Sequence, residues 1–423
     1  MSVYRALIWL KAPENRLWVK PAVGCVVAVL IALVAAVGNR LIPSGLLPDI
    51  ERSTLDTLLG VIASSMLGVA TFSLSIMVAA FSSAAAGASP RAIQLVAGDA
   101  DTQNAITSFI SAFIYAIIAN TALGLGLYGG TGRFILFVCT MGVLLYLIVT
   151  LVRWVKTLSV LGRMENTLAK LETAAKGAMS AHRRSPGMGA RLAPAETPAG
   201  YTIFANKVGY LRHIDMQALQ DLAEAASARL HLRVRPGQLV HPGCVLVIVE
   251  GGSAPDNTPE ADALRQAFVL GDGRSFDQDP RFGLIVLCEV AQRALSPAVN
   301  DPGTAIAAMN TITRVLVDTP VDTGDPTTPL DRLTLVPLDP ADFIHQAFDP
   351  IARDGASVSE IQLRMQKLLA IVAQDCGGAL GEAARRQAVI SLQRATQAMV
   401  LEQDKTHLRD VHNALFSGAD PAA

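Results

Sequence analysis

The stretch TLLGVIASSMLGVATFSLSIMVAAFSSAAAGASP, residues 57–90, lies between Asp56 and Arg91 and contains no charged residue. Its small and hydroxyl side chains recur at seven-residue spacing. At about 100° per residue on an α-helix they fall within a strip roughly 60° wide. This strip, which we call the hydroxyl seam, consists of Thr57, Ser64, Gly68, Thr71, Ser75 and Ser82. The stretch therefore predicts a long apolar helix with one small, hydroxyl-rich side.

The composition indicates a membrane protein. Hydrophobic residues make up 51% of the 423 residues and charged residues only 17%. Four apolar segments each have the roughly 18 residues needed to cross a bilayer: residues 21–38, 55–86, 105–128 and 134–155. We predict a polytopic α-helical membrane domain of four spans within residues 1–160.

Basic residues predict the orientation of these spans, because cytoplasmic segments are enriched in Lys and Arg. The segment between the third and fourth spans holds only Arg133. The segments before the first span and after the fourth are richer: Arg5, Lys11, Arg16 and Lys20, then Arg153, Lys156, Arg163, Lys170 and Lys176. We expect both termini in the cytoplasm.

The second span exceeds the thickness of the bilayer, so the helix must tilt strongly or project beyond the membrane and break near Gly87 and Pro90. Two interpretations of its seam stay open: close packing against another helix, or a polar path along a symmetry axis. A strip on the third span (Asn104, Ser108, Ser111 and Tyr115) could meet it. No charged or His side chain lies in the core of any span, which argues against a proton pump or a voltage sensor.

The remaining chain predicts a cytoplasmic α+β domain in three parts. Residues 161–200 are a connecting segment. It contains most of a helix predicted over 156–181, which begins at the end of the membrane domain, and a linker over 185–200. Residues 201–255 form a small β-rich subdomain, where a helix over 216–230 precedes two Pro-Gly turns in RPGQLVHPG (235–243) that favour a small β-barrel or sandwich. Residues 256–423 are mainly helical and end in a helical hairpin, 357–375 and 379–416, turned at Gly377-Gly378.

A polar cluster precedes the helix predicted to end at residue 295. It comprises Arg274, Asp277, Asp279 and Arg281. Beyond that helix, Asp301-Pro302 has the pattern of an N-cap followed by a helix-initiating proline. Asp301 is thus either a cap or, with Asn300 and the earlier group, part of an ionic network or ligand site.

Other site chemistry finds little support. The five cysteines form no CxxC pair, and the carboxylates match no metal loop, so we expect no metal site and no cofactor. The chain has no GxSxG, P-loop, HExxH or dinucleotide fingerprint, and we expect no enzyme. A formal net charge of −1 gives no basic field for nucleic acid.

Four segments resemble a bacterial family of predicted membrane proteins with a domain of unknown function. They are the Ser-rich second span, GYLRHID (209–215), RPGQLVHPG (235–243) and DQDPRFGLIVLCEVAQRALSPAVNDPGTA (277–305). The resemblance implies four spans, a cytoplasmic α+β domain and a place in the bacterial inner membrane. It implies no reaction.

Three functions remain as hypotheses. The first is a homo-oligomeric ion channel or pore lined by the hydroxyl seam and regulated by the cytoplasmic domain. The second is a membrane scaffold or sensor whose cytoplasmic domain binds a partner, a small ligand or an ion. The third is a membrane-associated enzyme, for which Asp277, Asp279 and Asp301 are the only candidate carboxylates. In each case the lipid bilayer is the expected surrounding.

Overall fold

A computed structural model describes residues 22–27, 29–30, 33–34, 48–97, 100–160, 162–193, 198–251, 259–319 and 330–417. The chain divides into two compact units. The first comprises Met1–Ala86 and Pro90–Thr167, and the second Gly87–Ser89 and Leu168–Ala423.

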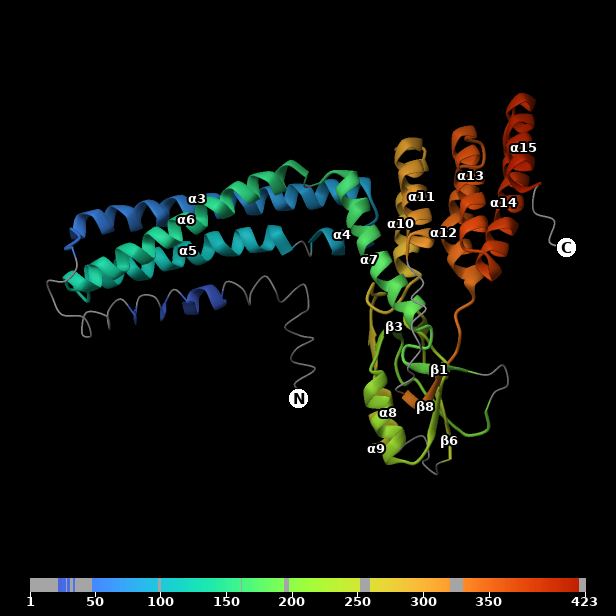
Figure 1. The fold of residues 1–423 in the computed structure, drawn as a ribbon, viewed down its shortest axis with the longest axis horizontal. Coiled ribbons are helices and arrows are strands. Elements are labelled where there is room, and N and C mark those ends of the chain that lie inside the picture. The colour runs from blue at the N-terminus through green and yellow to red at the C-terminus, as the bar shows by residue number, and fades with distance from the viewer. Residues whose placement is uncertain are drawn as a thin grey trace. The chain divides into compact units, whose positions relative to one another are not determined.

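Long helices build the first unit (Figure 1). They are α3 (Arg52–Gly87), α4 (Pro90–Ala97), α5 (Ala100–Gly124) and α6 (Gly130–Val160). Three stretches are long and apolar enough to cross a membrane: Arg52–Ser83, Thr102–Gly124 and Gly130–Leu158. They correspond to the last three predicted spans. Of the first predicted span, 21–38, residues 22–27, 29–30 and 33–34 are described and helical, whereas the N-terminal basic residues lie outside the described residues.

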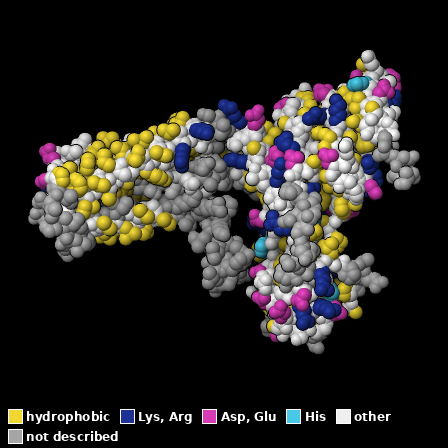
Figure 2. Space-filling model, viewed as in Figure 1, with side chains coloured by type: hydrophobic (Ala, Val, Ile, Leu, Met, Phe, Trp, Pro, Cys, Tyr) yellow, Lys and Arg dark blue, Asp and Glu magenta, His cyan; other side chains and the backbone are white. Residues whose placement is uncertain are grey.

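Apolar side chains also dominate the visible surface of this unit, whereas charged side chains are spread over the second (Figure 2). Inside it, α3, α5 and α6 share a hydrophobic core that includes Leu55, Leu59, Phe109 and Leu136. A surface that remains apolar outside such a core is typical of helices surrounded by lipid.

Helix α3 has 36 residues. At 1.5 Å per residue it is about 54 Å long, well beyond a hydrocarbon core of about 30 Å. It ends at Gly87, and Pro90 begins α4. A proline disfavours helical backbone at the preceding residue, which explains the predicted break.

A second break was not predicted. The single helix expected over 156–181 is wrong, because α6 ends at Val160 and α7 begins at Met164 (Met164–Arg184). Gly162 has φ +78°, a left-handed conformation that glycine adopts without steric penalty and that ends helices.

Two open sheets form the β part of the second unit. The strands are β1 (Ala190–Leu192), β2 (Tyr201–Phe204), β3 (Gly209–Ile214), β4 (Arg229–Leu232), β5 (Leu239–Val240), β6 (Val245–Glu250), β7 (Phe268–Gly271) and β8 (Leu330–Leu335). The sheet orders are β1-β8-β4-β6-β2 and β5-β3-β7. The described strands therefore do not close into the barrel that was one alternative. The sheets also take strands from outside 201–255, and β1 lies in the segment predicted as a linker.

Both sheets contribute to one core, through Ile203, Leu232 and Val247 from the larger and Leu211 and Val240 from the smaller. Helix α8 (Met216–Ala225) packs against β4 and β8, and α9 (Pro259–Gln266) against β7. The helix predicted over 216–230 is too long. Its backbone turns at Ser227, with φ +49°, and then enters β4.

The other end of this unit is helical (Figure 1). Its helices are α10 (Phe282–Leu295), α11 (Pro302–Val317), α12 (Pro340–Asp354), α13 (Ser359–Asp375), α14 (Gly378–Ala398) and α15 (Glu402–Phe416). The predicted hairpin exists as α13 and α14. Its second arm is shorter than predicted, because extended backbone at Met399 and Leu401 separates α14 from α15. No Gly or Pro marks that break in the sequence.

Candidate functional site

The hydroxyl seam lies on the outer surface of the described first unit. All six of its positions are exposed, and a Cβ added at Gly68 would meet nothing within 4 Å. The side of α3 that packs inward carries Leu55, Leu59, Ile62, Ala70, Ser73, Met77 and Ala80. At about 100° per residue, these positions centre roughly 180° from the seam. The seam is therefore not part of the packing between α3 and its own protomer's described helices.

Four of the seam hydroxyls donate their protons to backbone carbonyls of α3. The acceptors of Thr57, Ser64 and Thr71 are the carbonyls of Ser53 at 2.8 Å, Gly60 at 2.9 Å and Leu67 at 2.9 Å. Ser75 Oγ likewise donates to Thr71 O at 3.0 Å. A hydroxyl has one proton and two lone pairs. With the proton held by the backbone, the oxygens face outward as acceptors.

The polar strip on α5 does not meet the seam. Its Tyr115 hydroxyl lies 2.9 Å from Thr140 Oγ1 on α6. Ser108 Oγ donates to Asn104 O at 2.7 Å and lies 2.7 Å from the Tyr146 hydroxyl, also on α6. The α5 strip thus joins α5 to α6 by hydrogen bonds. It contacts α6 rather than the hydroxyl seam of α3, which was the contact that the sequence suggested.

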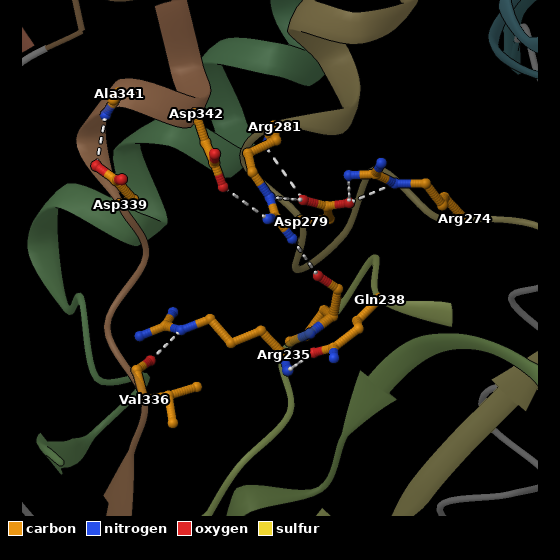
Figure 3. A network of polar contacts seen from close by, with 10 residues as sticks. Arg235, Gln238, Arg274, Asp279, Arg281, Val336, Asp339, Ala341 and Asp342 are labelled. Carbon is orange, nitrogen blue, oxygen red and sulfur yellow. Dashed lines mark hydrogen bonds and ion pairs between the residues drawn. The ribbon is translucent and has the colours of Figure 1, made fainter. Parts of the chain in front are cut away.

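The second candidate site centres on the Asp279 carboxylate, whose side chain is only 1% exposed. Arg274 donates to Oδ2 through Nε at 2.8 Å and through Nη2. Arg281 donates to Oδ1 through its backbone N–H at 3.2 Å and through Nε at 3.4 Å, and its Nη1 reaches Asp342 Oδ2 at 3.4 Å (Figure 3). A buried carboxylate needs such partners, because an unpaired buried charge is strongly unfavourable.

The Pro236-Gly237 turn covers this carboxylate. Gly237 has φ +89°, and a Cβ there would stand 1.8 Å from Asp279 Oδ2. Arg281 Nη2 donates to Pro236 O at 3.3 Å. Next to Asp279, the Gln278 amide accepts from Ile214 N at 2.9 Å and donates to Ile214 O at 3.3 Å. The motifs at 209–215, 235–243 and 277–283 therefore meet around one buried carboxylate.

Beside this network lies a cluster of cationic side chains. Arg235 is 4% exposed, and its guanidinium donates to the carbonyl of Val336 (Figure 3). It also donates to the carbonyl of Pro186 at 2.7 Å. Burial, together with the charge of Arg281, lowers the pKa of Arg235 to about 10. Burial and the charges of Arg235, Arg183 and Arg281 lower the pKa of His182 to about 4. This positive surrounding keeps the imidazole neutral and suits an anion.

The structure separates the rest of the predicted cluster from Asp279. Asp277 is exposed and bonds locally to Ser275 Oγ at 2.7 Å. Asn300 and Asp301 lie beyond the other end of α10, and Asn300 adopts φ +49°. Asp301 caps α11 by accepting from Thr304 N at 3.0 Å and Thr304 Oγ1 at 2.6 Å. These bonds hold its pKa below the usual value. The capping interpretation of Asp301 is confirmed, and none of its described side-chain hydrogen bonds reaches the Asp279 network.

Sequence reasoning missed Arg235, Gly237 and His182. Arg235 and Gly237 stand in the RPGQ turn, which was interpreted only as turn chemistry. Its position within a motif that resembles the family was the available signal. His182 gave none, because its environment arises from Arg235 and Arg281, which are distant in the chain. Among the described residues, no group of three His, Cys, Asp or Glu side chains could hold a metal ion.

Curated relatives match part of the chain. The relatives include an uncharacterized protein of Mycobacterium bovis and one of Mycobacterium tuberculosis, each 31% identical over 194 residues. Each match covers 43% of this chain and 37% of the relative, so well under half of either protein is aligned. No solved structure matches the chain.

A family match covers far more of the molecule. Residues 14–371 match the family described as predicted membrane protein (DUF2254), and this range includes α3, α5, α6 and the Asp279 network. The chain therefore belongs to this family of predicted membrane proteins.

Proposed function

We propose that this protein is a homo-oligomeric membrane channel for small cations, in which copies of α3 turn the hydroxyl seam toward a common axis. The observation that carries the proposal is the exposure of all six seam positions on the side of α3 opposite its packing side. The proposal includes no catalytic role.

The surroundings of the seam support a contact with a further helix. Large exposed side chains flank it, with Val61 and Phe72 on one side and Leu67, Leu74 and Val78 on the other. Between them the seam offers only small residues, which allow membrane helices to approach closely. A helix that touched lipid all round would have no need of such a groove.

The hydrogen bonds of the seam support cations as the permeant species. Because Thr57, Ser64, Thr71 and Ser75 give their protons to backbone carbonyls, their oxygens are left as outward acceptors. Rings of oxygen acceptors can replace part of the hydration shell of a cation. An anion would need donors at the same positions.

Cysteine cross-linking tests the assembly. In a background without the five native cysteines, Ser75→Cys is compared with Met77→Cys, which is buried on the opposite side of α3. We expect disulfide-linked dimers on oxidation of Ser75→Cys in membranes and none for Met77→Cys. Absence of linked species at Ser75 would contradict the shared axis.

Conductance tests the channel itself. In planar bilayers containing the purified protein, Thr71→Leu should abolish cation current by placing an apolar side chain in the polar path. Phe72→Leu is the matched control, because Phe72 flanks the seam and is 63% exposed. If Ser75→Cys links protomers but no current is found, the seam serves as a packing surface only.

The cationic cluster of the second unit favours another candidate function, an anion-responsive membrane sensor. Arg235 is buried, and in the described contacts its guanidinium bonds to two carbonyl groups and to no carboxylate. The charges of Arg183 and Arg281 also lie close enough to act on His182. Pyrophosphate should then raise the unfolding temperature of the wild-type protein and have no effect on Arg235→Gln. An equal effect on both proteins would exclude this site.

A further inference from the structure

A cavity of about 620 Å³ lies between α5 and α6, inside the first unit. Its lining includes Ser108 from α5 and Tyr146, Arg153, Trp154, Lys156 and Thr157 from α6. We infer that this cavity binds the phosphate headgroup of an anionic phospholipid.

The charges of the cavity support an anionic ligand. Arg153 and Lys156 are both exposed. Neither forms an ion pair with any described carboxylate, and no Asp or Glu is among the described lining residues. The N–H groups of these two cations supply the positive charge and the donors that a phosphate group accepts.

The position of the cavity supports a lipid rather than a soluble anion. Its lining on α6 extends from Tyr146 to Thr157, about 17 Å along the helix axis at 1.5 Å per residue. Over this length the neighbouring outer surface is apolar, with Leu145, Ile148 and Val152 exposed. A headgroup held by Arg153 and Lys156 would leave acyl chains free to lie along that surface.

Two aromatic side chains of α6 line the cavity, and Trp154 lies at the level of the two cations. Trp154 is buried in the protein and lines the cavity next to the two cations. The Tyr146 hydroxyl lies 2.7 Å from Ser108 Oγ, so the polar end of its ring is held within the cavity. Trp and Tyr concentrate at the headgroup level of membranes, and basic cavities between spanning helices at that level suit anionic headgroups.

The test measures lipid retained by the full chain. Protein is reconstituted in vesicles of phosphatidylglycerol and phosphatidylcholine, extracted in mild detergent, and analysed by native mass spectrometry. We expect wild-type protein to retain phosphatidylglycerol in preference to phosphatidylcholine. Arg153→Gln and Lys156→Gln should each lower that retention about fivefold, the expected effect of one interfacial cation. Arg153→Lys should retain it, which separates loss of the site from loss of the fold.

Arg163→Gln is the matched control, because it removes one exposed cation from the same unit outside the cavity. Retention that falls equally in Arg163→Gln would show a diffuse surface charge effect and overturn the inference. Equal retention of both lipids by the wild type would do the same. Displacement of phosphatidylglycerol by millimolar inorganic phosphate or glycerol phosphate would identify a soluble anion as the ligand and refute the lipid assignment.

Discussion

Replacing Asp279 by Asn tests whether one buried carboxylate holds the second unit's motifs together. The substitution keeps the size of the side chain but removes its charge and turns one acceptor into a donor. In the wild-type protein, Oδ2 accepts two N–H groups from Arg274, and Oδ1 accepts two from Arg281. In the variant, an NH₂ group would face one of these pairs of donors.

The expected loss follows from the burial of the partners. Removing one member of a buried ion pair typically costs about 3–5 kcal/mol, because the other charge stays buried and unpaired. The Arg274 and Arg281 side chains are 19% and 14% exposed, and Arg281 keeps Asp342. We therefore expect a loss near the lower limit, about 3 kcal/mol. With a urea dependence of about 2 kcal/mol per M, the unfolding midpoint should fall by about 1.5 M.

The assay needs a probe within the second unit. No tryptophan lies beyond Trp154, so tryptophan fluorescence does not follow that unit. Cys288 on α10 is 2% exposed, and burial raises the pKa of its thiol to about 12. In a variant that retains only this cysteine, maleimide labelling against urea concentration should report exposure of α10.

Asp277→Asn is the matched control, because Asp277 is exposed and its carboxylate bonds to Ser275 alone among the described side chains. We expect its midpoint to shift by less than about 0.25 M, because most surface substitutions change stability by less than about 0.5 kcal/mol. If Asp279→Asn shifts the midpoint no more than Asp277→Asn, the buried network does not stabilise the second unit and the reasoning fails.

Three further predictions concern the stability of the second unit, measured by the labelling assay for the two glycine substitutions and by circular dichroism for His182. Gly237→Ala should destabilise the second unit much more than Gly243→Ala does. Both positions have positive φ, but only at position 237 would the added Cβ meet Asp279. Similar losses of stability in the two variants would contradict the close contact. Because the pKa of His182 is lowered to about 4, its imidazole stays neutral in the folded protein, whereas in the unfolded chain it takes up a proton near pH 6.5. The stability of the second unit should therefore decrease as the pH falls from 6.5 to 4. His182→Gln should reduce that decrease, measured by urea unfolding followed by circular dichroism. Gly177→Ala should raise stability by about 0.5–1 kcal/mol, since the helix interior there has open space; a decrease would contradict it.

Local signals in the sequence predicted local structure well. The uncharged stretch predicted α3 and its break, and the Asp301-Pro302 pair predicted the start of α11, because each signal acts within a few residues of the chain. Pairings between distant segments were not predicted. Strand β1 has three residues and pairs in parallel with β8, through pairs such as Ala190 with Leu330 whose members are 140 or more positions apart in the chain. So short a strand leaves no periodic pattern to detect.

The candidate sites divide in the same way. Periodicity placed six residues on one side of α3, yet it could not tell whether that side faces the protomer's own helices or away from them. Likewise, sequence proximity grouped Asp277 with Asp279, although only Asp279 is buried. The direction of a side chain depends on which distant elements pack against its own, and one sequence does not specify that.

The distribution of side-chain size on α3 adds an argument about its neighbours. Membrane helices gain little from burying apolar surface against one another, so their closest contacts rely on small residues that bring the backbones together. On α3 the inward side mixes large residues, including Leu55, Leu59 and Met77, with the small Ala70, Ser73 and Ala80, whereas the outward seam consists of small residues alone. The helix is thus suited to a closer neighbour outside the described protomer than within it. In a two-fold contact, which is isologous, a second copy of α3 would offer the same groove in return.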